Sequence, residues 1–72
     1  MHEKLPAVSG YETIKAFTRL GFAIVRRRGS HVVLQKGLII FTVPLHRTLK
    51  KGTFHAILKQ SGVSIEELRK VL

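Results

Sequence analysis

The chain has 72 residues, 44% of them apolar, and it contains no cysteine. This length has room for one hydrophobic core, so we expect a single domain over residues 1–72. Without cysteine the chain can form no disulfide and no thiolate metal site. Its 13 Lys and Arg against 4 Asp and Glu give a net charge of +9. That charge favours a polyanionic partner, nucleic acid first and an acidic protein second, over a charge that only maintains solubility.

The N-terminus and the hydropathy pattern give no sign of export or membrane insertion. No apolar segment follows a basic start over Met1–Pro6, so we expect no secretory leader. No uninterrupted apolar run approaches the length that crosses a bilayer. We therefore expect a soluble, cytoplasmic protein with no membrane partner.

The first predicted element is an amphipathic helix over residues 10–20. Ser9 and Glu12 have the spacing of a capping box, and Gly21 is suited to the left-handed position that ends a helix. Apolar side chains, which we expect to face the core, recur at helical spacing at Tyr11, Ile14, Phe17 and Leu20.

Three short strands are predicted next, over residues 22–28, 31–36 and 38–43. Tight turns at Gly29-Ser30 and at Gly37 connect them. Connections this short force an antiparallel meander, with the second strand in the centre.

The third strand is apolar on both faces, although a meander places it at an edge, where exposed apolar side chains favour aggregation. We expect another protein chain to cover it, and a homo-oligomer formed through this strand is one form of that contact. The alternative is that residues 62–72 of the same chain fold over it.

Pro44 ends the third strand, because proline cannot donate to the ladder. Thr53 is predicted to open a second helix that stops at Gly62. Ser64 and Glu67 repeat the capping-box spacing before a last short helix. The expected order is α-β-β-β-α-α, an α+β fold.

The stretch from Arg26 to His31 is the first candidate site. Because side chains alternate along a strand, Arg26 and Arg28 share one face and Arg27 takes the other. Arginine binds phosphate through a two-pronged set of donors, and histidine exchanges protons near neutral pH. The turn at Gly29 and Ser30 adds backbone N–H donors. His31 is therefore a candidate acid or base for RNA cleavage, although a solvated histidine at a turn is the more common case.

The loop after the third strand holds further candidates. Lys50 and Lys51 precede the second helix, whose N-terminus attracts phosphate, unless the loop is merely solvated. His46 is a candidate second proton carrier, unless it is a loop histidine without a role. The histidine spacing matches no metal site, and nucleotide-hydrolysis, serine-hydrolase and glycosidase motifs are missing. No metal and no cofactor are expected.

In these features the sequence resembles the HicA (YcfA-like) family, small toxins of type II toxin–antitoxin systems. The resemblance covers nearly the whole chain. Its motifs, in order, are Leu20-Gly21-Phe22, Gly29-Ser30-His31, Val43-Pro44-Leu45-His46, Lys51-Gly52-Thr53, Ile57-Leu58-Lys59-Gln60 and Gly62.

The resemblance implies a double-stranded-RNA-binding-domain-like fold, mRNA interferase activity and a HicB-type antitoxin that masks the active site. It makes His31 the catalytic histidine. Many members have a second histidine directly afterwards, and this chain has Val32 instead. Two other readings stay open: a non-catalytic RNA-binding module of the same fold, and a domain that binds an acidic protein.

Overall fold

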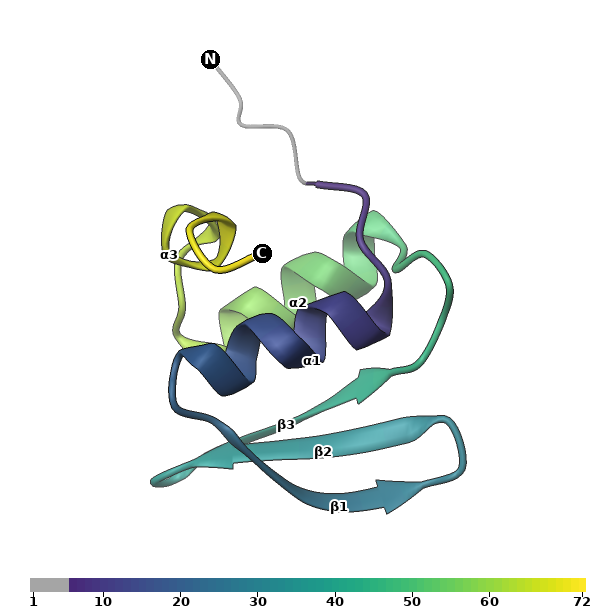
Figure 1. The fold of residues 1–72 in the computed structure, drawn as a ribbon, viewed down its shortest axis with the longest axis vertical. Coiled ribbons are helices and arrows are strands. Elements are labelled where there is room, and N and C mark those ends of the chain that lie inside the picture. Colours follow the sequence, from purple (N-terminus) through teal and green to yellow (C-terminus); the bar gives the residue numbers. More distant parts are fainter. Residues whose placement is uncertain (1–5) are drawn as a thin grey trace.

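The computed structural model describes residues 6–72. The expectation of no secretory leader was based on Met1–Pro6, which lie almost entirely outside the described residues. The predicted order of elements is confirmed (Figure 1). The elements are α1 (Gly10–Arg19), β1 (Ala23–Arg28), β2 (His31–Lys36), β3 (Ile39–Pro44), α2 (Lys51–Ser61) and α3 (Ile65–Arg69). None of the helices within residues 6–72 is long and apolar enough to cross a membrane.

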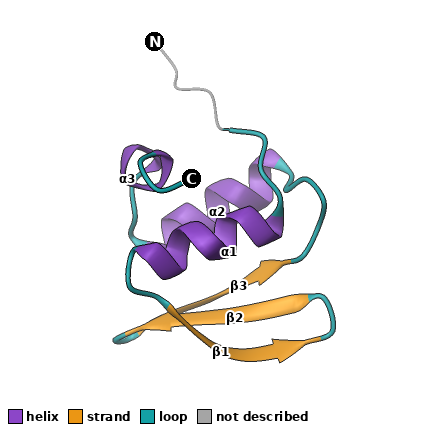
Figure 2. Ribbon diagram, viewed as in Figure 1, coloured by secondary structure: helices purple, strands orange, loops and turns teal. Residues whose placement is uncertain are grey.

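The strands form one antiparallel sheet in the order β1-β2-β3, with β2 in the centre as predicted. Helices α1 and α2 lie across one face of this sheet, and α3 lies beyond them (Figure 2). No helix of residues 6–72 covers the opposite face, which we call the open face (Figure 2). This arrangement confirms the α+β, double-stranded-RNA-binding-domain-like fold.

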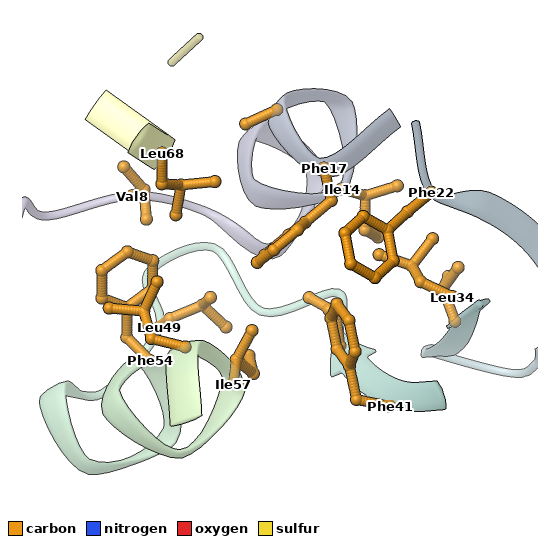
Figure 3. Close-up of a cluster of buried hydrophobic side chains, with 14 residues drawn as sticks. Val8, Ile14, Phe17, Phe22, Leu34, Phe41, Leu49, Phe54, Ile57 and Leu68 are labelled. Carbon is orange, nitrogen blue, oxygen red and sulfur yellow. The ribbon is translucent and has the colours of Figure 1, made fainter. Parts of the chain in front are cut away.

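Three phenylalanines join α1 to the sheet (Figure 3). The ring centroids of Phe17 and Phe41 are 4.9 Å apart, and the ring of Phe22 lies 5.3 Å from each of them. All three pairs meet edge to face, an arrangement that contributes about 0.5–1.5 kcal/mol per pair beyond burial of area. This cluster fixes the end of α1 on β3.

The C-terminal helix does not cover the edge strand. Leu68 of α3 is fully buried and packs near Val8, on the far side of the helices from the sheet (Figure 3). Leu38 is fully exposed and Ile40 is 56% exposed. The alternative in which residues 62–72 fold over β3 is therefore wrong.

Two further expectations are wrong in detail. Helix α2 begins at Lys51 rather than Thr53, because the extended backbone of Lys50 forms the N-cap without a side-chain hydrogen bond. Tyr11 does not belong to the core, since its side chain is 64% exposed. It lies in the first turn of α1, and the capping box that starts this helix at Ser9 and Glu12 is formed as predicted.

A β-bulge at Val25 decides which residues of β1 face the helices. Ile24 is paired with the buried Leu34, and Arg26 is paired with Val33, so the register shifts between them. Uninterrupted alternation from Ile24 would have placed Arg26 on the helix side. The extra residue turns Arg26 to the open face instead.

Candidate functional site

The β1–β2 turn has two central residues, and its shape depends on glycine. Gly29 has a φ of +59°, and no non-glycine residue among those described has a positive φ. Positive φ at the first central residue alone is the pattern of a type II′ turn. The Arg27 Nε donates a hydrogen bond of 3.2 Å to the Gly29 carbonyl. Arg27, which does not lie on the open face, therefore supports the turn.

Arg28 and His31 are the pair that flanks this turn. Directly opposite residues have Cβ atoms about 4.5–5.5 Å apart, so the two side chains are neighbours on one face. His31 is also paired with Pro44 on its other side. Because His31 opens the central strand, its backbone is held between two strands.

Arg26 lies in the next outward-facing row, paired with Val33, which is in turn paired with Thr42. Two residues along a strand span about 7 Å, so the guanidinium groups of Arg26 and Arg28 can engage one phosphate or two adjacent phosphates. The open face thus gathers Arg26, Arg28 and His31, all exposed. The predicted separation of Arg27 from the other two arginines is confirmed.

The loop that carries His46 is tied to the same corner of the molecule. The Leu45 N–H donates a 2.6 Å hydrogen bond to the Ser30 carbonyl, and the Gly10 N–H donates one of 2.9 Å to the His46 carbonyl. The turn, the end of β3 and the start of α1 therefore meet at one edge (Figure 1). The His46 side chain is exposed there.

The close approach of α1 to the end of β3 requires glycine at position 10, and Gly10 was not identified as a candidate from the sequence. A Cβ built on Gly10 would lie 1.9 Å from the Pro44 carbonyl oxygen, which no side chain can tolerate. A glycine directly after a capping residue, where better helix formers are available, is the one local signal that could have revealed this close approach.

Lys50 and Lys51 form the exposed N-terminus of α2, and the first turn of this helix contains no acid. No hydrogen bond within residues 6–72 links either lysine to the turn at Gly29 and Ser30. The two lysines are therefore a separate cationic feature beyond the loop of residues 45–50.

The stretch of sequence that supplies the candidate site residues, Arg26 to Lys51, contains no Asp or Glu. The whole chain has no Asp, and residues 13–65 have no Glu. Among the described residues, no group of three or more His, Cys, Asp or Glu could hold a metal ion. The described residues bring His31, the arginines of β1 and the backbone N–H groups of the turn to this corner.

Residues 10–63 match a family model described as the HicA toxin of bacterial toxin–antitoxin. The matched range runs from the start of α1 to just past the end of α2 and includes the turn, the open face and the His46 loop. No curated protein matches the chain.

Proposed function

The chain belongs to the HicA toxin family and is the toxin of a toxin–antitoxin pair, and from this premise we propose that it is an endoribonuclease that cleaves mRNA. One observation carries the proposal. His31 is held at the start of the central strand, opposite Arg28 and on the face that also bears Arg26. This arrangement supports the proposal, in which His31 carries a proton and the two arginines bind phosphate.

In the proposed reaction, the 2′-oxygen of a ribose attacks the adjacent phosphorus and the 5′-oxygen departs, leaving a cyclic phosphate. His31 accepts the 2′-hydroxyl proton or donates one to the leaving 5′-oxygen. Arg26 and Arg28 bind the phosphate and stabilise the charge that develops on its oxygens. The N–H groups of Gly29 and Ser30 add donors at the same position.

The second proton carrier is His46 in this proposal. The Leu45–Ser30 hydrogen bond holds its loop against the turn, and no acid is available between residues 13 and 65. With two histidines in opposite roles, the reaction needs no metal and no cofactor. Lys50 and Lys51 would bind a more distant phosphate through charge and the N-terminus of α2.

The antitoxin is proposed to be HicB-type and to bind along the edge of β3. Lys36 and Ile39 flank a two-residue turn and are paired, so the backbone groups of Ile40 and Thr42 point away from β2, unpaired. A groove of about 780 Å³ runs beside this edge towards Ala56 and Gln60 of α2. A second copy would bring two domains of net charge +9 together. An oppositely charged antitoxin strand therefore suits this edge better. We propose that both proteins act in the cytoplasm.

His31→Ala tests the catalytic proposal when cleavage and binding of one RNA are measured together. We expect cleavage to fall by about 10²–10⁴-fold, the usual contribution of a positioned acid or base, while binding is largely retained. His55→Ala, an exposed histidine on α2, is the matched control and should cleave normally.

Two outcomes would favour the other readings. A wild-type chain that binds RNA with a steep salt dependence but does not cut it is a binding module. A chain that ignores RNA near physiological salt, yet binds an acidic protein, is a protein-interaction domain.

A further inference from the structure

A second, smaller pocket lies on the helix side of β1, next to the turn. Its volume is about 270 Å³, and it is lined by Tyr11, Ile14, Ile24, Arg27, Val32 and Leu45. Val32 directly follows His31, and the Leu45 N–H is bonded to the Ser30 carbonyl. The pocket therefore adjoins the proposed catalytic corner from the opposite side of the strand.

The lining combines an apolar floor with an aromatic and cationic rim. Ile14 and Val32 are buried at the floor, whereas Tyr11 at the rim is 64% exposed. Arg27 uses its Nε to bond the Gly29 carbonyl. This bond fixes the side chain and leaves the four N–H groups of its two terminal nitrogens with no hydrogen-bond acceptor among the described residues.

The charges around the pocket suit an anionic polymer. The Lys15 ammonium lies 5.5 Å from the centroid of the Tyr11 ring. The nearby acid, Glu12, accepts a hydrogen bond from the Ser9 N–H and so is engaged in the helix cap. An apolar floor does not suit a phosphate, which would lose its hydration there.

We propose that this pocket binds one unpaired nucleobase of the RNA. Tyr11 would stack on the base, and the free N–H groups of Arg27 would donate to its edge. The volume is just below the ~300 Å³ at which small-molecule pockets begin, a size suited to a planar base rather than a whole nucleotide. This inference rests on the proposed function and adds the state of the substrate to it.

A base in this pocket must be out of any duplex. Proteins read single-stranded RNA by stacking splayed bases on aromatic and arginine side chains, whereas they read duplex RNA mainly by shape and backbone. The protein, despite its double-stranded-RNA-binding-domain-like fold, should therefore prefer RNA that is unpaired beside the scissile phosphate.

Tyr11 is the only tyrosine in a chain without tryptophan, so its intrinsic fluorescence reports directly on the pocket. The His31→Ala chain, which should not cut its ligand, is titrated with a short single-stranded oligoribonucleotide, an abasic strand of equal length and a blunt RNA duplex. We expect quenching by the base-bearing single strand and little by the other two. Equal quenching by the abasic strand would overturn the proposal.

Variants at Tyr11 provide the second arm. In the same His31→Ala background, Tyr11→Ala should weaken binding of the base-bearing strand at least about fivefold, the lower end for loss of one base stack. Tyr11→Phe should retain binding, and abasic binding should not change. Because Tyr11 is mostly exposed, circular dichroism should show the same fold in each variant. Unchanged RNA affinity in Tyr11→Ala would sink the idea, whether or not this variant also loses antitoxin binding.

The two proposals can fail separately. A wild-type chain that cleaves RNA while Tyr11 fluorescence ignores the base would refute the base pocket and keep the enzyme. Base-dependent quenching by a chain that never cleaves RNA would keep the pocket and refute the endoribonuclease.

Discussion

Arg28 and His31 are the last cross-strand pair before the β1–β2 turn, so a cationic residue and a histidine lie directly opposite each other in the sheet. A two-residue turn leaves this pair little freedom. A phosphate held by Arg28 would therefore stay within reach of the histidine throughout proton transfer, as near-attack geometry requires.

Neutralising either open-face arginine should weaken RNA binding in a salt-dependent way. Arg26→Gln and Arg28→Gln each remove one phosphate contact, which lowers the slope of log K against log salt by about 0.7 for single-stranded RNA. Binding isotherms of each variant at several salt concentrations measure this slope. Lys59→Gln, an exposed cation on α2, is the control and should leave the slope almost unchanged. Equal slopes for all three variants would contradict the proposed role of the open face.

Removal of His46 should change the pH dependence of cleavage. An enzyme with one acid and one base shows a bell-shaped profile of rate against pH. His46→Ala should lose one limb of this bell and about 10²-fold or more in rate, while RNA affinity stays near that of the wild type. Rates measured from acid to alkaline pH under single-turnover conditions test this. A bell of unchanged shape would assign the second proton to another group.

Gly10→Ala should destabilise the fold and loosen the catalytic corner. The new Cβ would clash with the Pro44 carbonyl, and overpacking of this kind costs about 1–3 kcal/mol. The melting temperature should fall by about 4–8 °C per kcal/mol in a domain of this size. Gly52→Ala is the matched control, because a Cβ there has open space. It should stabilise α2 by about 0.5–1 kcal/mol. Equal melting temperatures for both variants would contradict the close approach.

The capping boxes should make stability sensitive to acid. Hydrogen bonds from the Ser9 backbone and side chain lower the pKa of Glu12 below its ordinary value of 4.5, and the Ser64 backbone and side chain lower the pKa of Glu67 in the same way. A folded-state pKa below the unfolded value contributes stability above that unfolded value, which is lost as pH falls through the folded value. The Glu12→Gln, Glu67→Gln double variant should melt lower near neutral pH and lose less on acidification. Thermal scans from pH 7 downward check both points.

A charge on the β3 edge should separate antitoxin binding from catalysis. Ile40→Lys places an ammonium at the exposed apolar edge, and we expect antitoxin affinity to fall at least about tenfold, or ~1.4 kcal/mol, while RNA cleavage is retained. Leu72→Lys alters an exposed apolar residue elsewhere and should keep full affinity. Light scattering of the toxin alone provides a further check. A dimer that Ile40→Lys dissociates would show that a second copy occupies the edge.

The sequence predicted the parts of the fold that depend on local signals. The capping boxes at Ser9 and Ser64 and the left-handed glycines at Gly21 and Gly62 each act within a few residues, so their positions could be read directly. The start of α2 was missed because Lys50, its N-cap, makes no side-chain bond.

The candidate site was less predictable, since it is assembled by contacts between distant segments. The pairing of Arg28 with His31 follows from a turn visible in the sequence. By contrast, the Leu45–Ser30 bond and the approach of Gly10 to Pro44 join segments far apart in the chain. The pocket beside Tyr11 depends on both, and an exposed aromatic looks the same as a core aromatic in a helical repeat.

The bulge at Val25 has a genetic consequence. Because Val25 is the extra residue of β1, Ile24 and Arg26 on either side of it pair with the consecutive residues Leu34 and Val33. Exchange of Val25 for another β-favouring residue should be tolerated, since the side chain is half exposed. An in-frame deletion of this single codon would remove the bulge and make Ile24 and Arg26 consecutive residues opposite Leu34 and Val33, so that Arg26 and Arg28 would keep the open face. In a mutational scan, the position should therefore tolerate both substitution and deletion of its codon.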